Sequence, residues 1–101
     1  MKQNLKVIFG QPSWPLRSST VEAFVTETGG HLAPVIFDRA RRRIQPYSVS
    51  PWCEEKVDTI PLLEVLRGDF FCLPFGGNAT PFRGERHPVH GETANRKWKF
   101  E

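Results

Sequence analysis

The sequence lacks long apolar runs and has few cysteines. No stretch approaches the roughly 20 consecutive apolar residues that a membrane-spanning helix needs, so we expect no membrane partner. The N-terminal segment has no apolar stretch long enough for a secretory signal peptide, and by default we expect a cytoplasmic protein. Cys53 and Cys72 form no CxxC pair. This predicts two reduced, packed thiols, without a metal centre or another cofactor.

Proline and glycine, in contrast, are abundant, with 9 and 8 copies among 101 residues. Both interrupt long helices and favour strands joined by turns. The 8 phenylalanines and 3 tryptophans favour the same structure, because aromatic side chains suit a half-buried pleated surface. With 39% hydrophobic and 25% charged residues, the composition predicts one folded, mostly β domain over residues 1–101.

The formal net charge is +3, and part of the excess comes from the run DRARRR at residues 38–43. One interpretation is a patch that binds nucleic acid or phosphate. The other is a solvated hairpin tip between two strands. The run is short and has no interleaved aromatic residues, so we expect the hairpin tip and no nucleic-acid partner.

A hairpin is the clearest structural pattern. Residues 21–26 alternate with a period of two, which is typical of a strand, and Gly29-Gly30 supplies a turn. Residues 32–37 then form the returning strand, where Pro34 indicates an edge position or a bulge. The short apolar run at residues 5–9 is either an edge strand or a loose N-terminal arm.

The second half of the chain predicts one helix and two further strands. Residues 60–66 suit a short helix that has Pro61 at its first position. Residues 69–78 read as a buried strand that leads into a pocket loop, and residues 96–101 as the start of another strand. Three or four strands with one helix would leave a sheet face uncovered. We therefore expect self-association, or pairing with a missing C-terminal part of the domain.

Arg67 and Gly68 follow the expected helix and allow two interpretations. The planar fork of an arginine binds hydroxyl pairs, carboxylates or phosphates, and glycine lets the backbone approach a ligand. Alternatively, Arg67 caps the C-terminus of the helix, where its charge meets the helix dipole. The segment LPFGGN at residues 73–78 either presents backbone amides to a ligand or is a plain loop.

The segment HPVHGETANRKW at residues 87–98 concentrates polar chemistry. His87 and His90 have a spacing that suits a shared metal, but apart from Glu85 or Glu92 no third ligand has an obvious spacing, so a zinc site is disfavoured. Followed by glycine, His90 at a loop-to-strand junction would place an imidazole in a pocket, where it exchanges hydrogen bonds near neutral pH. The alternative is a surface loop of polar residues.

Together these segments resemble the N-terminal part of the aldose 1-epimerase (galactose mutarotase-like) superfamily, nearest its hexose-phosphate epimerase-like branch. The order is TGGHLAP, VSPW, LRGDFFCLPFGGN and HPVHGETANRKW. The residues that match the family's RGG-x-P-x-x-x-P-x-FG and H-G-F-A-R-N-x-x-W type motifs are Arg67, Gly68, Pro74, Phe75, Gly76, His90, Gly91, Asn95 and Trp98. Asp69 replaces a common second glycine, and Glu92-Thr93-Ala94 replace Phe-Ala-Arg. An unphosphorylated sugar therefore also fits the pattern.

The resemblance implies an antiparallel β-sandwich of which this chain is the N-terminal portion, with one short helix. It implies an isomerase of carbohydrate metabolism that binds a hexose or related sugar, free or phosphorylated, and interconverts its anomers. In the family, a base removes the anomeric hydroxyl proton while an acid protonates the ring oxygen, and both groups come from later parts of the chain. We expect this chain alone to be inactive. The alternative is a non-catalytic carbohydrate-binding or sensing module on the same fold.

The resemblance also implies a site around one shallow polar cleft. His90 matches a family histidine that contacts the substrate and supports the charge developing on it, and is the catalytic residue expected here. The expected substrate-binding residues are Arg67, Phe75, Asn78, His90, Asn95, Arg96 and Trp98.

Overall fold

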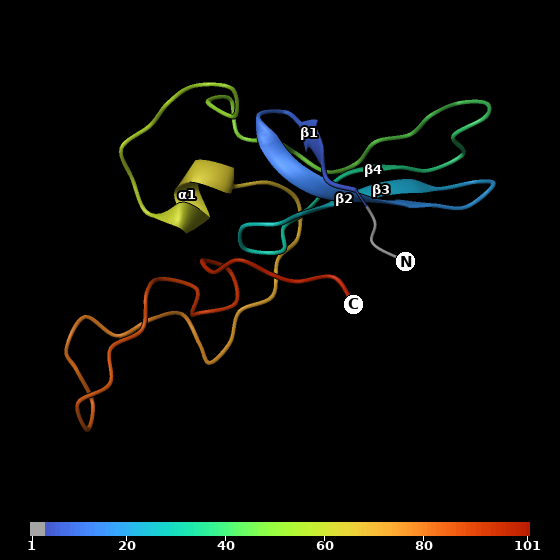
Figure 1. Cartoon of the computed structure of the whole chain (residues 1–101). Helices are drawn as coiled ribbons and strands as arrows, with labels where there is room; N and C mark the ends of the chain where they lie inside the picture. Colours follow the sequence, from blue (N-terminus) through green and yellow to red (C-terminus); the bar gives the residue numbers. More distant parts are fainter. Residues whose placement is uncertain (1–3) are drawn as a thin grey trace.

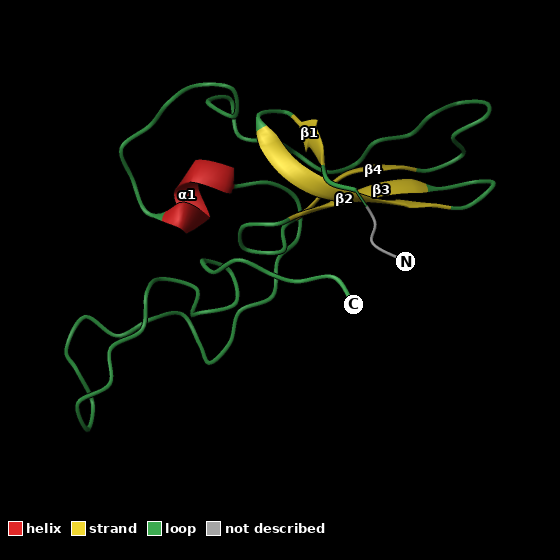
Figure 2. Ribbon diagram, in the orientation of Figure 1, coloured by secondary structure: helices red, strands yellow, loops and turns green. Residues whose placement is uncertain are grey.

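The computed structural model describes residues 4–101 and contains one four-stranded antiparallel sheet beside one short helix (Figure 1). The sheet order is β1-β2-β3-β4, so each strand pairs with its neighbour along the chain. The elements are β1 Lys6–Ile8, β2 Gln11–Arg17, β3 Glu22–Thr26, β4 Leu32–Ile36 and α1 Pro61–Val65. Loops and turns make up most of the chain after β4 (Figure 2). The expected mostly β, antiparallel fold with one short helix is therefore confirmed.

The hairpin of β3 and β4 turns where its glycines predict. The Thr26 N–H donates to the His31 carbonyl at 2.9 Å, and Gly29 and Gly30 between them have φ of +78° and +59°. Pro34 lies in β4, which is an edge strand of the sheet. Helix α1 begins at the proline that predicts its start. Local turn and helix-start chemistry is therefore sufficient to locate these elements.

Strand β2 is not predicted by sequence patterns, because Pro12 and Pro15 each lack an N–H for the ladder. The Pro12 carbonyl accepts a bond from the Glu27 N–H at 2.9 Å, so Pro12 faces β3. In a regular ladder, residue 12 would return a bond to the Glu27 carbonyl. That carbonyl instead accepts the Trp98 N–H at 2.7 Å. The proline thus leaves an acceptor free for the C-terminal segment.

Pro15 is tolerated for a different reason. Residues of a strand face alternate sides of the ladder, so the Pro15 nitrogen faces β1, on the opposite side from Pro12. The pairing of β1 with β2 extends only as far as Ser13. The missing N–H of Pro15 therefore interrupts no bond to β1.

Two strand predictions in the second half are wrong. Residues 69–78 form an irregular segment with isolated bridges, in which Phe71 is 60% exposed and Leu73 is also exposed. Cys72 in the same segment is exposed, so the prediction that both thiols are packed is wrong for this one. Residues 96–101 form a loop with a single bridge, Thr28 to Lys97. Their alternation is compatible with a strand, but they dock on the β3–β4 turn and not along a free strand edge.

The basic run forms a solvated hairpin tip as predicted, but only β4 flanks it as a strand, and Ile44 belongs to an isolated bridge. Phe37 and Ile44 exchange two main-chain hydrogen bonds, at 2.8 and 2.9 Å, and close the loop. Arg41, Arg42 and Arg43 are exposed at its end, and Arg42 pairs with Asp38 at 2.9 Å. This tip extends away from α1 (Figure 1).

The buried apolar residues come from the sheet, from α1 and from one position near the C-terminus: Trp14, Phe24, Ala33, Val35, Leu62, Val65 and Ala94. The chain after α1 extends away from the sheet as loops and then returns to it at the C-terminal end (Figure 1). Within residues 4–101, no helix has the length and apolar character needed to cross a membrane.

Gly68 offers a test of how tightly the segment after α1 fits the sheet. Its φ is +49°, and a Cβ there would lie 1.8 Å from the Leu32 carbonyl oxygen. Gly84 also has a positive φ, +79°, but nothing lies within 4 Å of its position for a Cβ. Gly84→Ala should lower the free energy of unfolding by about 1 kcal/mol through backbone strain alone. Gly68→Ala should cost more than about 2 kcal/mol in denaturant unfolding, because strain and clash combine. Equal losses for the two variants would contradict the close approach.

Candidate functional site

Arg67 is a buried structural group. It is 2% exposed, and its guanidinium donates to the carbonyls of Val65 at 2.8 Å, Ile8 at 2.8 Å and Phe9 at 2.9 Å. The bond to Val65 caps the C-terminal end of α1, as one of the two interpretations predicts. The other two bonds join the helix to the β1–β2 turn. Burial lowers the pKa of Arg67, although a guanidinium stays protonated in proteins.

His31 lies next to Arg67 and is missed by the sequence predictions, which treat it as part of a turn. Its ring is fully buried, its Nδ1 accepts the Arg67 main-chain N–H at 3.4 Å, and its Nε2 lies 3.1 Å from the Ala94 carbonyl. Since Nδ1 accepts, Nε2 carries the proton and donates. Burial lowers the pKa of His31, as do the charges of Arg67 and His90, while the Ala94 carbonyl opposes them. His31 is therefore a neutral crosslink between three segments.

An aromatic stack connects this buried pair to His90. The His31 ring stacks on the Phe70 ring at a centroid distance of 4.5 Å. The His90 ring contacts the same Phe70 ring edge-on at 5.2 Å. His90 is exposed and has a left-handed backbone with φ of +63°. Its Nδ1 lies 3.4 Å from the Cys72 Sγ. His90 is thus linked to Arg67 through His31 and Phe70, while the Arg67 guanidinium points to main-chain carbonyls.

Asn95 and Asn78 hold loops in place. The Asn95 Oδ1 accepts the Leu62 N–H at 2.9 Å, in the first turn of α1, and its Nδ2 donates to the carbonyls of Val89 and Gly91. The Asn78 Oδ1 accepts the His87 N–H at 2.7 Å, and its Nδ2 donates to two carbonyls of the same loop. Both amide groups are therefore committed to the backbone.

Arg96 belongs to an ionic cluster centred on Glu92, and Phe75 packs against this cluster. One oxygen of Glu92 pairs with the His87 Nδ1 at 2.9 Å, and the other accepts from the Arg96 Nε at 2.6 Å. Glu85 lies 3.4 Å from the His87 Nε2, and Phe75 contacts the ring edge-on. The bond to Glu92 raises the pKa of His87, and the same bond lowers the pKa of Glu92.

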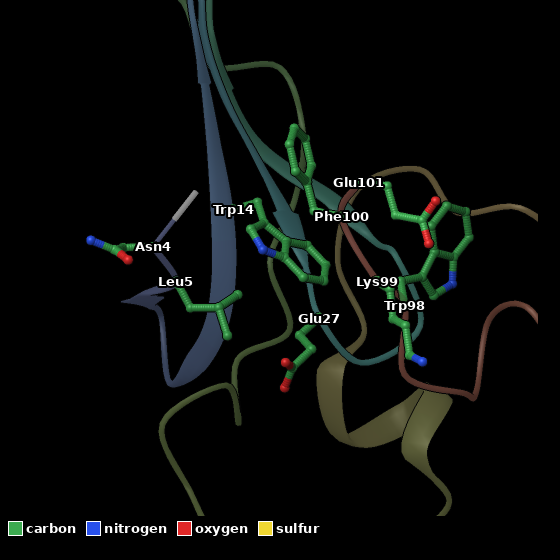
Figure 3. A pocket seen from close by; sticks show the side chains of 8 residues that line it. All are labelled: Asn4, Leu5, Trp14, Glu27, Trp98, Lys99, Phe100 and Glu101. Carbon is green, nitrogen blue, oxygen red and sulfur yellow. The ribbon is translucent and has the colours of Figure 1, made fainter. Parts of the chain in front are cut away.

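A groove of about 590 Å³ lies between β2, residues 4–5 and residues 98–101. Trp14 and Phe100 face each other there at a centroid distance of 6.3 Å, with Leu5 beside them (Figure 3). Glu27, directly after β3, adds a carboxylate that also pairs with Lys97 at 3.4 Å. The groove is lined by Asn4, Leu5, Trp14, Glu27, Trp98, Lys99, Phe100 and Glu101.

The expected site residues are distributed over several hollows. Trp98 lines the groove and, with Arg96, a neighbouring hollow of about 220 Å³. Asn78 lines a separate hollow of about 360 Å³ beside His87, and Arg67 one of about 270 Å³ beside α1. Sequence reasoning misses the groove, because Trp14 and Phe100 come from opposite ends of the chain. Their aromatic character is the one signal that could have indicated it.

Comparison of the chain with protein-family models, with curated proteins and with solved structures finds no match. Within residues 4–101, no group of three or more His, Cys, Asp or Glu side chains is placed to hold a metal ion.

The two buried or paired histidines should give opposite pH effects on stability. His31 has a folded pKa below its ordinary value of 6.5, so its contribution is present above pH 6.5 and is lost as the pH falls through the folded pKa. His87 has a folded pKa above that value, so its contribution is present below pH 6.5 and is lost as the pH rises through the folded pKa. His31→Gln should flatten the acid side of the profile of unfolding free energy against pH. His87→Gln should flatten the alkaline side of the same profile. Unchanged slopes in both variants would contradict these assignments.

Proposed function

We propose that this chain binds a hexose or related sugar, as the N-terminal part of an aldose 1-epimerase-like β-sandwich. The observation that carries the proposal is the groove between Trp14, Trp98 and Phe100. Its volume of about 590 Å³ is within the range of small-molecule sites. A second sheet of the sandwich would cover apolar side chains that are exposed on the strands, such as Val7 and Leu16.

The chemistry of the groove suits a sugar. The C–H faces of a pyranose need apolar cover, which the Phe100 ring, 46% exposed and next to Trp14, offers. The hydroxyl groups need directional partners. Carboxylates of Glu27 and Glu101 accept from hydroxyls, and the ammonium of Lys99 donates to them. Two carboxylates in the groove repel a phosphate, so we propose a neutral sugar over a phosphorylated one.

Binding, and not catalysis, is the part of the epimerase reaction that this chain performs in our proposal. Anomer exchange needs an acid and a base within hydrogen-bond reach of the same sugar. Glu27 is already paired with Lys97, and His90 does not line the groove. The acid and the base would come from the part of the domain that completes the site. A non-catalytic carbohydrate-binding module remains the second candidate, and the same groove supports it.

Sugar binding can be measured by tryptophan fluorescence, because Trp14 and Trp98 line the groove while Trp52 is held elsewhere by a bond to the Leu63 carbonyl. We expect neutral hexoses to bind with a Kd in the millimolar range. Phe100→Ala should weaken binding about tenfold, a loss of about 1.4 kcal/mol, because it removes one aromatic wall. The matched control is Phe82→Ala, which truncates a phenylalanine that is 69% exposed outside the groove. Equal effects of the two changes, or no response to any hexose, would contradict the proposal.

Polarimetry separates binding from catalysis. The chain alone should leave the mutarotation rate of a hexose at its buffer value while fluorescence reports binding. A rate above the buffer value that His90→Ala abolishes would show that residues of this chain carry the chemistry themselves.

A further inference from the structure

We propose that Cys72 is a reactive thiol, activated by His90, that exchanges with small disulfides. This inference is independent of sugar binding, because neither residue lines the groove. The Cys72 Sγ lies 3.4 Å from the His90 Nδ1, and both residues are exposed. A thiol and an imidazole within hydrogen-bond reach are the arrangement of an activated sulfur nucleophile.

The main chain on both sides of Cys72 is anchored. The Leu73 N–H donates to the Thr93 Oγ1 at 3.0 Å, and the Leu73 carbonyl accepts the Glu92 N–H at 2.7 Å. The same threonine hydroxyl donates to the Phe71 carbonyl. Gly91 makes this approach possible, since a Cβ there would lie 2.5 Å from the Leu73 oxygen. Cys72 is therefore held between Phe71 and Leu73, which are both hydrogen-bonded to residues 92–93, close to His90.

The imidazole is positioned from the other side. The His90 N–H donates to the Gly76 carbonyl at 2.9 Å, and the ring rests edge-on against Phe70. Phe70 is itself stacked on the buried His31. These contacts supply the third group that orients a general base next to its nucleophile. The Nδ1 that faces the sulfur is the acceptor, so Nε2 carries the ring proton when the thiol is intact.

A small disulfide is the only co-reactant that the proposed reaction needs. The Cys72 proton moves to the His90 Nδ1, and the thiolate attacks one sulfur of a small disulfide RSSR. A Cys72–S–S–R bond forms as the original S–S bond breaks. The departing RS⁻ takes the proton from the imidazolium and leaves as RSH. Cys72 is oxidised to the mixed disulfide, and half of RSSR is reduced. The exposed Phe71 and Leu73 on either side favour an apolar or aromatic R group.

Cys53 is a control within the same chain. It is half-buried, and its carbonyl lies against Gly10 of the β1–β2 turn. Cys53→Ser leaves Cys72 as the reacting thiol, and Cys72→Ser leaves Cys53. Dithiodipyridine, a neutral aromatic disulfide, reports each reaction by absorbance. At neutral pH we expect the folded Cys53→Ser protein to react at least about tenfold faster than the folded Cys72→Ser protein, and the two rates to converge in denaturant.

His90→Asn separates activation from mere exposure. Asparagine tolerates the left-handed backbone of residue 90 but cannot take the thiol proton. In the Cys53→Ser background, this change should lower the Cys72 rate at least about tenfold. In the Cys72→Ser background the same change should leave the Cys53 rate unchanged. A raised Cys53 rate would instead show that the variant had unfolded, because unfolding exposes the half-buried Cys53. His90→Gln is the second variant if the first does not fold. A folded variant of either kind that keeps the original Cys72 rate would overturn the proposal, as would equal rates for the two cysteines in the folded chain.

Discussion

The guanidinium of Arg67 is the group on which the arrangement of this chain depends. A buried charge costs several kcal/mol unless hydrogen bonds replace its lost water. Here three carbonyls from α1 and from the β1–β2 turn do so. The Arg67 main chain adds a bond to His31, and Gly68 follows with a conformation that allows contact with β4. The Arg-Gly pair therefore joins the helix, the first turn and the edge strand at one point.

The remainder of the second half is held mainly by polar side chains. Ala94 is the buried apolar residue there, while Phe71 and Phe82 are largely exposed. Asn95, Asn78 and Thr93 replace apolar packing with hydrogen bonds to the backbone. Few apolar contacts give such a region a low local stability, which suits surfaces that bind or react. Both proposed sites involve this part of the chain: the sugar groove at its end, and the thiol on its loops.

The sequence predicts the elements whose cause is local and fails where the cause is distant. Gly29-Gly30 and Pro61 locate a turn and a helix start without reference to the rest of the chain. Strand β2 is not predicted, because two distant features make its prolines acceptable. The pairing with β1 stops before it reaches Pro15, and the Trp98 N–H bonds to the Glu27 carbonyl that Pro12 cannot use. Arg67 is recognised as a special residue, but its partners are main-chain carbonyls of Ile8 and Phe9, which leave no trace in side-chain patterns. The groove likewise depends on Trp14 meeting Phe100 from the other end of the chain.

Arg67→Lys tests the structural role of this arginine most directly. Lysine keeps the charge but has no planar fork with which to reach three carbonyls at once. Our account predicts that the free energy of unfolding falls by about 3 kcal/mol or more in denaturant unfolding. Amide hydrogen exchange should quicken together in α1 and in the β1–β2 turn. An unchanged stability, combined with a loss of sugar binding, would instead identify Arg67 as a ligand group and would contradict the account.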